Sequence, residues 1–415
     1  MVEKLFELSH FYLRHYNKEY RRFFLHKYPL KNRFYIITGP RGVGKTTLLI
    51  QYILDQVNGN SHTREAIYIP VDHTLVAKYS LYEIAETFVK EEGVKLICFD
   101  EIHKYSDWSR DLKSMYDVFP GLRILASGSS ALEINKSSHD LSRRAVAYHM
   151  PGMSFREFIE FTITPRLKLN SYTLDEIVTN HETITHQIVE ILEKHDSRVL
   201  PLFKDYLKFG YYPYFIEHLE QIEEFHLKLE QDVRKTLLTD FINVYPNLNG
   251  ASINKIIKLL SILTGSVPYT PDLNDLKRKL EIGDARTLKQ YLKFLEDGNV
   301  LLSVSKKGRG FSELEKPEKI YLNNTNLVYA LGESISPDKG TLRETFFANS
   351  VSAFYKVCTV DSGDFSVNDK YTFEVGGKNK NYKQIKEIDN SFMAVDDTEA
   401  GFKKKIPLWL FGFLY

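Results

Sequence analysis

The chain has 415 residues, of which 43% are hydrophobic and 26% charged, values that are ordinary for a globular protein. Its 55 Lys and Arg residues are offset by 54 Asp and Glu, a formal net charge of +1. This balance excludes a protein that is basic throughout, so any nucleic-acid surface must be local. The only two cysteines, Cys98 and Cys358, exclude a disulfide framework and a thiolate metal cluster, and they fit a reducing cytosol.

Membrane and export signals are missing from the sequence as well. No run of about 18 apolar residues exists to span a bilayer, and the N-terminal segment lacks the apolar core of a signal peptide. We therefore expect a cytoplasmic protein without membrane contact. The apolar C-terminal run IPLWLFGFLY (406–415) is too short to span, and we expect it to form a terminal strand packed into a core.

The first part of the chain alternates between two kinds of predicted element. Residues 1–33 are rich in aromatic and basic side chains and are expected to be helical. Five short apolar runs then indicate strands, the first and third of them buried, and helical segments separate the first four. Strands that alternate with helices imply crossover connections and a parallel sheet, so the sequence predicts an α/β fold. The expected strands are 34–39, 66–73, 95–101, 123–130 and 145–150.

A glycine-rich motif follows the first expected strand and opens a helix. Residues Gly39 to Thr46 match the P-loop pattern G-x-x-x-x-G-K-[ST] in full. The glycines let backbone N–H groups turn toward phosphate oxygens, and the helix adds the positive end of its dipole. Lys45 is expected to reach the β- and γ-phosphates, and the Thr46 hydroxyl to ligate Mg²⁺. The strand before the motif and the helix after it favour this Walker A reading over an ordinary glycine turn.

A second element of the same site is predicted at the end of the third strand. The run KLICFDE ends in Asp100 and Glu101, which places two carboxylates at the carboxyl edge of a parallel sheet, where ligands of such folds bind. We expect Asp100 to hold Mg²⁺, directly or through water. Glu101 is expected to act as a general base on the attacking water. The alternative is a solvated acidic strand end.

Polar residues also follow the fourth strand and precede the fifth. Ser127 and Ser129 are candidates to touch the γ-phosphate or the water, with Ser127 preferred because it lies closer to the strand; the alternative is a plain turn. Arg143 and Arg144 precede the fifth strand, where an arginine could neutralise transition-state charge in cis or in a neighbouring subunit. A surface role is the alternative for both. Asp72 is expected to cap or turn the chain.

These segments resemble AAA-type P-loop ATPases of archaea and bacteria whose second half is a conserved domain of unassigned role. The resemblance implies a catalytic acidic pair at Asp100 and Glu101 and matches the family's arginine to Arg144. His103 and Trp108 belong to the family pattern, and we expect them to pack. The matching stretches are YIITGPRGVGKTTLL, LICFDEIHKYSDWSRDLKSMYD, ILASGSS, LSRRAVAYHMPGMSFREF and YLKFGYYPYF. The ATP-binding residues that it implies are Gly39, Pro40, Arg41, Gly42, Val43, Gly44, Lys45, Thr46 and Thr47.

The second half is expected to begin with a helical connector and to continue with a winged helix. Three helices are predicted between residues 252 and 298, with Asp284 as the N-cap of the third and Gly298 just past its end, followed by a strand that enters a basic hairpin. The third helix and the wing could meet DNA phosphates; a protein-contact role is the equal alternative. The basic residues concerned are Arg286, Lys289, Lys293, Lys306, Lys307 and Arg309.

The C-terminal part resembles, within the same family, a restriction-endonuclease-like fold whose acidic ligands match Glu344, Asp364 and Glu374. Active nucleases of that type need Glu-x-Lys on one strand, and here the third position is Gly376. The nearest lysine, Lys378, would serve only if the chain bends at the glycine pair. We therefore expect an inactive, nuclease-like domain.

The sequence thus predicts four parts: a P-loop AAA-type ATPase domain (1–154), a helical connector (155–250), a winged helix (251–312) and a nuclease-like α/β domain (313–415). The expected activity is Mg²⁺-dependent hydrolysis of ATP that works as a switch or motor on a protein or nucleic-acid partner. The alternatives are an ATP-responsive DNA-binding regulator and an ATP-gated nuclease. An oligomer is possible, since the arginine could act in its own subunit or in a neighbouring one.

Overall fold

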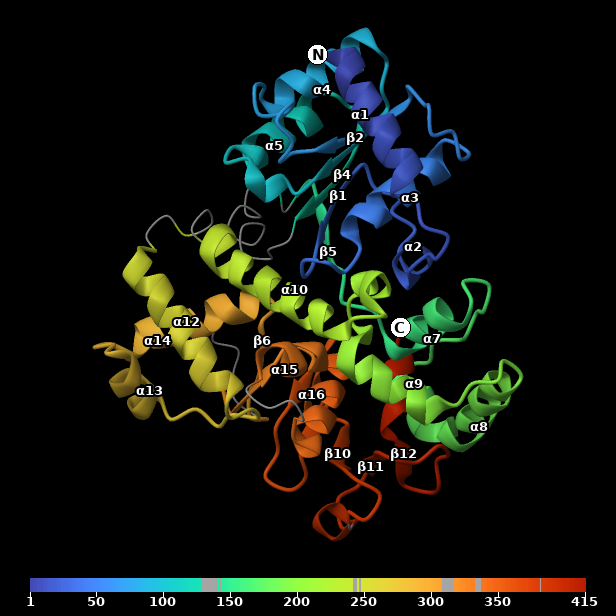
Figure 1. The fold of residues 1–415 in the computed structure, drawn as a ribbon, viewed down its shortest axis with the longest axis vertical. Helices are drawn as coiled ribbons and strands as arrows, with labels where there is room; N and C mark the ends of the chain where they lie inside the picture. The colour runs from blue at the N-terminus through green and yellow to red at the C-terminus, as the bar shows by residue number, and fades with distance from the viewer. Residues whose placement is uncertain are drawn as a thin grey trace. The chain divides into compact units, whose positions relative to one another are not determined.

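The computed structural model describes residues 1–128, 141, 143–241, 245, 248–307, 317–332, 337–380 and 382–415. The chain forms two compact units (Figure 1). The first comprises Met1–Gly152 and Thr239–Asn247, and the second comprises Met153–Leu238 and Leu248–Tyr415. The three-way division expected within the second unit stays a prediction. Across the described residues, no helix combines the length and the apolarity that a membrane crossing requires.

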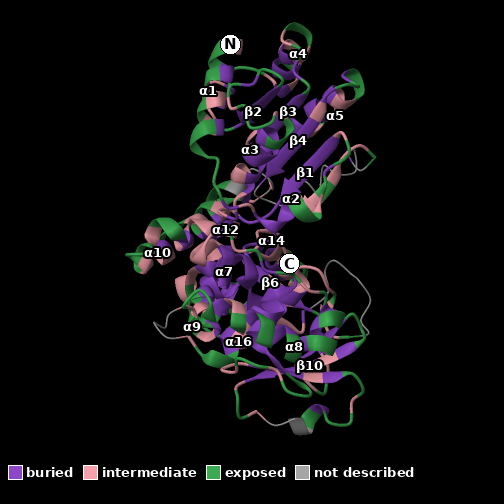
Figure 2. Ribbon diagram, turned by 90° about the vertical axis from the view of Figure 1, so that its right-hand side faces the viewer, coloured by how far each residue is buried: buried purple, intermediate pink, exposed green. Residues whose placement is uncertain are grey.

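The first unit is built on a five-stranded sheet in which every neighbouring pair is parallel, in the order β2-β3-β4-β1-β5. This confirms the predicted α/β fold. Strands β1 to β3 are buried along their whole length, as expected where helices cover both faces of a parallel sheet (Figure 2). The strands are β1 (Phe34–Thr38), β2 (Ala66–Pro70), β3 (Leu96–Asp100), β4 (Arg123–Gly128) and β5 (Val146–His149).

Helices on the two sides of this sheet share the burial of its side chains. Apolar residues of α4 and α5 pack against alternate strand residues such as Ile67, Ile97 and Phe99. Helix α3 contacts β2, β3 and β4, and α1 contacts α3 and the edge strand β2. The expected helical N-terminus is therefore two helices with an irregular segment between them. The bounds are α1 (Val2–His15), α2 (Phe23–Lys27), α3 (Lys45–Gln56), α4 (Leu81–Glu91), α5 (Trp108–Val118) and the 3₁₀ turn η1 (Ile102–Lys104).

The second unit begins with helices, as predicted, and continues with three helices and an antiparallel strand pair. Asp284 caps α14 through the N–H of Arg286, as expected. Gly298 is the C-cap rather than the residue after it, and Asn299 takes the left-handed conformation (φ 57°) instead. These elements follow the order expected of a winged helix, which stays a prediction; Arg309 lies outside the described residues. The bounds are α7 (Phe155–Ile163), α8 (Leu174–Glu193), α9 (Val199–Asp205), η2 (Tyr206–Gly210), η3 (Pro213–His218), α10 (Ile222–Lys235), η4 (Thr236–Asp240), α12 (Gly250–Thr264), α13 (Leu273–Leu280), α14 (Ala285–Asp297), β6 (Leu301–Val304) and β7 (Lys319–Leu322).

A mixed five-stranded sheet completes the second unit, in the order β12-β11-β10-β9-β8. The pairs β8–β9 and β9–β10 are antiparallel, whereas the pairs β10–β11 and β11–β12 are parallel. Helix α16 covers this sheet through Phe347, whose ring lies 5.2 Å from Phe365 and 5.1 Å from Phe373. The bounds are α15 (Thr325–Leu331), α16 (Lys339–Ser352), β8 (Val357–Cys358), β9 (Phe365–Val367), β10 (Tyr371–Gly376), η5 (Tyr382–Ile385), β11 (Ser391–Val395), β12 (Lys405–Pro407) and η6 (Leu408–Phe413).

The C-terminal run is buried in a core, as expected, but only its first two residues, Ile406 and Pro407, lie in a strand. Strand β12 ends at Pro407, and η6 is a 3₁₀ helix whose side chains are all buried. A strand would alternate its side chains between two faces, whereas a helical turn can bury all of them among α7, α8 and α16. The final carbonyl, of Tyr415, accepts hydrogen bonds from Ser154 Oγ and Arg156 Nε.

Candidate nucleotide site

The P-loop connects β1 to α3, and its backbone has the shape that the motif requires. Gly39, Gly42 and Gly44 have φ values of 152°, 80° and 96°, a region that other residues seldom adopt. Gly39 also passes so close to the Met150 carbonyl that a Cβ at this position would collide with it. Helix α3 begins at Lys45, so the positive end of its dipole faces the loop. The loop is therefore built to bring backbone N–H groups close to an anion.

Lys45 lies inside the loop rather than in solvent. Its side chain is 5% exposed, and its Nζ donates to the carbonyl oxygens of Gly39 and Pro40 at 2.9 and 2.8 Å. A phosphate oxygen with a full negative charge is a stronger acceptor than a neutral carbonyl. The ammonium is therefore placed where phosphates bound in the loop would compete for it.

Asp100 lies at the centre of a set of hydroxyl groups from three elements. Thr46 Oγ1 from α3 and the Tyr68 hydroxyl from β2 each donate to Asp100 Oδ2 at 2.6 Å. Ser127 Oγ from β4 donates to Oδ1. The residue is 3% exposed, and a buried carboxylate needs such donors to offset the loss of water. Both predicted magnesium-binding residues, Thr46 and Asp100, thus meet directly.

This donor set fits Mg²⁺ by its chemistry. A threonine hydroxyl and a carboxylate are hard oxygen ligands, and Mg²⁺ is usually held by one or two carboxylates together with substrate phosphates and water. Among the described residues no group of three or more His, Cys, Asp and Glu side chains could hold a metal alone. The cation would consequently depend on the nucleotide for part of its coordination.

Tyr68 is a member of the site that sequence reasoning missed. Burial and the charge of Asp100 raise the pKa of its hydroxyl far above the ordinary value, so it stays protonated and acts as a donor. Its own position is fixed by α1: Tyr68 N–H donates to Ser9 Oγ at 3.0 Å, and the Tyr12 ring lies 4.8 Å away. A tyrosine in an apolar strand reads as core; only the pairing of β2 with β3 brings its hydroxyl to Asp100.

Glu101, the expected general base, has a strained backbone and an unforeseen partner. Its φ and ψ are 57° and 43°, in the left-handed region, and its N–H donates to Ser127 Oγ at 3.3 Å. Glu101 Oε2 lies 3.3 Å from Nε2 of His103, whose side chain is 1% exposed. His103 therefore contacts the acidic pair instead of only packing. Trp108 does pack in the core, as expected.

Other predicted residues of the site lie as follows. Ser127 is fully buried beneath the acidic pair, so in this structure it supports Asp100 and Glu101 rather than facing an open phosphate site. Ser129 falls outside the described residues. Arg144 makes a two-pronged ion pair with Asp117 of α5, at 2.8 and 2.9 Å, which it would have to leave to reach a phosphate. Arg143 is exposed.

His149 is a second residue near the P-loop that the sequence did not indicate. It ends β5, pairs in register with Thr38 and has its Nδ1 3.4 Å from Thr38 Oγ1. Desolvation, followed by the charge of Lys45, lowers the pKa of His149, but the shift is limited because the residue is exposed to solvent. The imidazole is thus neutral at pH 7 and can accept or donate a hydrogen bond beside the loop.

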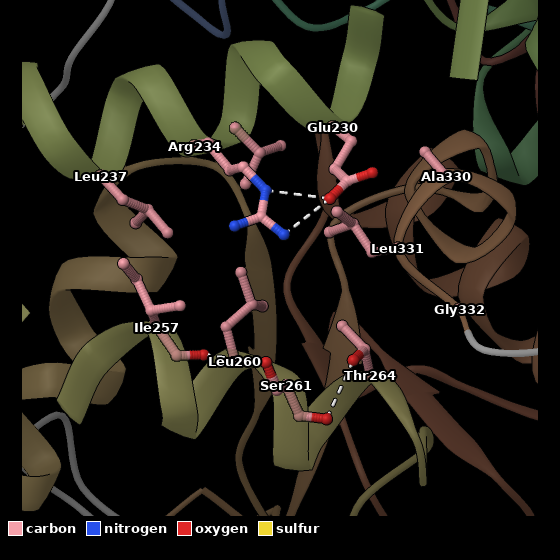
Figure 3. A pocket seen from close by; sticks show the side chains of 11 residues that line it. Glu230, Arg234, Leu237, Ile257, Leu260, Ser261, Thr264, Ala330, Leu331 and Gly332 are labelled. Atoms are coloured by element: carbon pink, nitrogen blue, oxygen red, sulfur yellow. Dashed lines mark hydrogen bonds and ion pairs between the residues drawn. The ribbon is translucent and has the colours of Figure 1, made fainter. Parts of the chain in front are cut away.

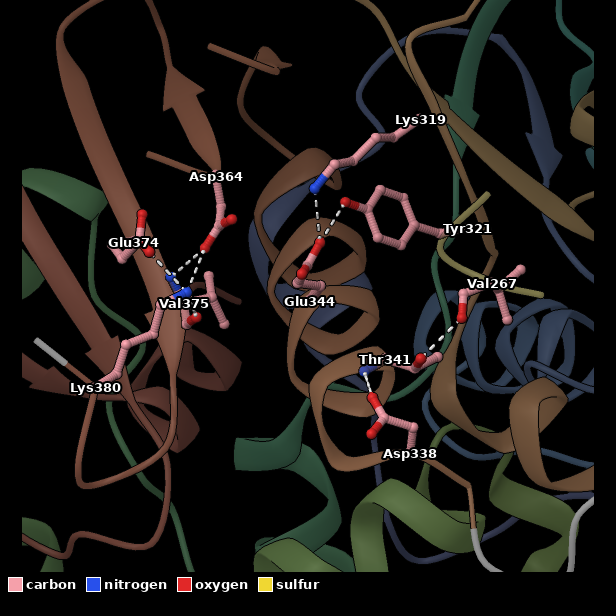
Figure 4. Close-up of polar contacts among 10 residues, drawn as sticks. All are labelled: Val267, Lys319, Tyr321, Asp338, Thr341, Glu344, Asp364, Glu374, Val375 and Lys380. Carbon is pink, nitrogen blue, oxygen red and sulfur yellow. Dashed lines mark hydrogen bonds and ion pairs between the residues drawn. The ribbon is translucent and has the colours of Figure 1, made fainter. Parts of the chain in front are cut away.

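In the second unit, the three expected nuclease-like carboxylates are paired with two different lysines (Figure 4). Burial, followed by the charges of Asp364 and Glu344, raises the pKa of Glu374. Glu344 of α16 accepts from the Tyr321 hydroxyl at 2.8 Å and pairs with Lys319 at 3.1 Å. Asp364 and Glu374 instead share Lys380, whose Nζ lies 3.4 Å from Asp364 Oδ2 and 2.7 Å from Glu374 Oε1.

The lysine that reaches these carboxylates is therefore Lys380 and not the expected Lys378. The chain after β10 bends back so that the Lys380 side chain lies over Gly376, where a Cβ would collide with it. If the strand continued past Gly376, no lysine would lie beside Asp364 and Glu374. Gly376 stands where active nucleases have a lysine, and its missing side chain leaves room for Lys380. Lys380 Nζ also donates to the Val375 carbonyl at 2.8 Å.

A separate small pocket of about 220 Å³ lies between α10, α12 and α15 of the second unit (Figure 3). Its walls are mostly aliphatic, and its polar edge carries Arg234, which is paired with Glu230 at 2.8 Å. The Ser261 and Thr264 hydroxyls are bonded to helix carbonyls. Each of these polar groups therefore already has a partner within its own helix.

Comparison with protein families agrees with the geometry of the first unit. Residues 31–159 match the family model described as AAA domain. Residues 200–339 of the second unit match a model described as Domain of unknown function (DUF8612). A search of curated proteins found no match to this chain.

Solved structures show only remote likenesses. The structure of C. elegans PCH-2 is 17% identical over 39% of this chain, with a TM-score of 0.24, and the chain spans only 45% of that protein. AMPPCP-bound DnaA from Aquifex aeolicus is 14% identical over 70% of this chain and 86% of its own, with a TM-score of 0.25. Domain III of Thermotoga maritima DnaA is 18% identical over 44% and 87%, also at 0.25. Scores this low support no inference about function.

The position of Lys45 predicts the effect of removing its charge. Lys45→Ala should weaken ATP binding by about 2 kcal/mol or more, because truncating one partner of a buried charge pair has a cost of that size. Titration calorimetry measures the change, with Lys90→Ala on the exposed face of α4 as the control. Equal affinity of the Lys45 variant and the wild type would contradict the assignment of the P-loop.

Tyr68→Phe removes one hydroxyl donor from Asp100 and leaves the ring in place. A hydrogen bond to a charged group contributes about 1.5–3 kcal/mol, so the Mg²⁺ concentration needed for half-maximal ATP binding should rise about tenfold. Binding measured in EDTA should stay unchanged, because the hydroxyl acts on the metal side of the site. Tyr52→Phe, whose hydroxyl accepts from Arg123 and not from the Asp100 cluster, is the matched control. A Mg²⁺ requirement that stays at the wild-type value in Tyr68→Phe would refute the role.

The ion pairs around Lys380 predict that the second unit does not cut DNA. Lys380 is paired with Asp364 and Glu374, and Lys319 is paired with Glu344, so a divalent cation would have to compete with both lysines for these carboxylates. We expect no plasmid nicking with Mg²⁺ or Mn²⁺. Metal-dependent nicking by the wild type that disappears in both Glu374→Ala and Lys380→Ala would show an active nuclease instead.

Proposed function

We propose that this chain binds ATP with Mg²⁺ and hydrolyses it, using the cycle as a switch or motor on a macromolecular partner. One observation carries the proposal. The Thr46 hydroxyl and the Asp100 carboxylate, two hard oxygen ligands, lie 2.6 Å apart directly beside a P-loop whose glycines have the required backbone shape. The match of residues 31–159 to an AAA domain supports it.

In the proposed reaction the loop and Lys45 bind the phosphates, while Thr46 and Asp100 would hold the cation. When bound, Mg²⁺ neutralises charge on the β- and γ-phosphates. Glu101 accepts a proton from the attacking water as general base. Glu101 Oε2 lies 3.3 Å from His103 Nε2, so His103 can help to fix the orientation of this carboxylate.

The partner is a protein or a nucleic acid, and the second unit is where we expect it to act. Part of the basic surface proposed for DNA is neutralised locally: Lys293 pairs with Asp297 at 3.0 Å, and Lys306 pairs with Asp361 at 2.5 Å. Arg286 near the start of α14 remains exposed. We therefore favour a protein partner, and a DNA-binding regulator that uses ATP only to set conformation is the second candidate.

Glu101→Gln tests hydrolysis separately from binding. The amide is nearly isosteric and cannot accept the water's proton, so turnover should fall by about 10²–10⁴-fold while ATP affinity stays close to the wild-type value. Phosphate release and calorimetry measure the two quantities, with Glu86→Gln on α4 as control. Wild-type turnover in Glu101→Gln would exclude this residue as the base; turnover stimulated by duplex DNA would favour the nucleic-acid partner.

A further inference from the structure

Arg22 is a buried cation that touches the P-loop from outside the matched AAA segment. It lies just before α2, is 8% exposed, and its guanidinium donates to three backbone carbonyls. Nη1 donates to Val43 O and to Pro151 O, both at 2.9 Å, and Nη2 donates to Gly152 O at 2.6 Å. One planar group therefore holds the middle of the P-loop and the last residues of the first unit together.

The three carbonyls belong to two different segments of the chain. Val43 belongs to the phosphate-binding motif itself. Pro151 and Gly152 end the first unit, and Met153 begins the second. We call residues 149–152 the exit segment. A guanidinium presents its N–H groups in a rigid fork, so moving either segment changes the bonds to the other. The three hydrogen bonds also offset the cost of burying the positive charge, so losing one of them would destabilise the folded protein.

The exit segment is tied to the P-loop at a second point as well. Met150 N–H donates to Thr38 O at 2.8 Å, and the Met150 carbonyl packs against Gly39 where no side chain would fit. The loop is thus held at its start by Met150 and in its middle, through Arg22, by Pro151 and Gly152. Rearrangement of the loop backbone cannot leave the exit segment unaffected.

We propose that Arg22 is a positioning residue that couples nucleotide binding in the P-loop to the exit segment, and through it to the chain entering the second unit. The proposal rests on the ATP binding proposed above. Phosphates that draw the loop's N–H groups toward them shift the Val43 carbonyl and redistribute the three bonds of Arg22. Coupling of this kind is reciprocal, so loss of Arg22 also alters the affinity for ATP.

Hydrogen exchange measured by mass spectrometry tests the coupling in the full chain, with and without Mg-ATP in the Glu101→Gln background. In the chain that keeps Arg22, ATP should slow the exchange of backbone amide hydrogens in peptides from the P-loop and in peptides covering 149–165. With Arg22→Gln, the P-loop should still respond, the response at 149–165 should be lost, and ATP affinity should fall about fivefold, the lower end of measured couplings. Arg21→Gln is the matched control, because Arg21 pairs with the half-exposed Asp55 at 2.6 Å.

An unchanged response at 149–165 in Arg22→Gln would overturn the proposal. Arg22→Lys, which keeps the charge but not the fork, should show the same uncoupling; if both variants unfold, Arg22 is only structural and the proposal fails. Absence of ATP binding by the unsubstituted chain would remove the proposed function itself, an outcome distinct from normal binding with an unchanged exit segment.

Discussion

The nucleotide site depends on one buried carboxylate and the hydroxyl groups that hold it. Asp100 receives donors from Thr46, Tyr68 and Ser127, which belong to α3, β2 and β4. An unpaired carboxylate at this depth would be costly, so the three elements are held in mutual register by the charge that they share. The bonds from Tyr68 and Ser127 also hold the Asp100 carboxylate beside the hydroxyl of Thr46. The acidic pair, the loop and the parallel sheet therefore form a single arrangement.

Around this centre the chain fixes the P-loop from two directions. On one side Asp100 bonds Thr46 at the start of α3. On the other, Met150 and Arg22 bind the loop to the exit segment. In the second unit, Lys380 pairs with both Asp364 and Glu374. The residues predicted to bind and hydrolyse the nucleotide thus all lie in the first unit.

The sequence predicted what depends on local pattern. The strands of the parallel sheet, the P-loop and the position of Asp100 follow from apolar runs and motif spacing. Contacts set by register could not be predicted: Tyr68 reaches Asp100 only because β2 pairs with β3, and His149 lies beside Thr38 only because β5 pairs with β1. Lys380 was missed because a chain reversal after Gly376 has no periodic signal. The C-terminal run was misjudged because an apolar decapeptide fits a strand or a buried 3₁₀ helix equally well.

The central claim is that Asp100 holds the cation that accompanies ATP. Mn²⁺ can replace Mg²⁺, and its electron paramagnetic resonance signal reports how much of the metal is bound. The account predicts that wild-type protein binds Mn²⁺ tightly only in the presence of ATP, and that Asp100→Asn, which keeps the shape but removes the charge, loses this binding while ATP still binds in EDTA. ATP-dependent Mn²⁺ binding of equal strength in Asp100→Asn would contradict it.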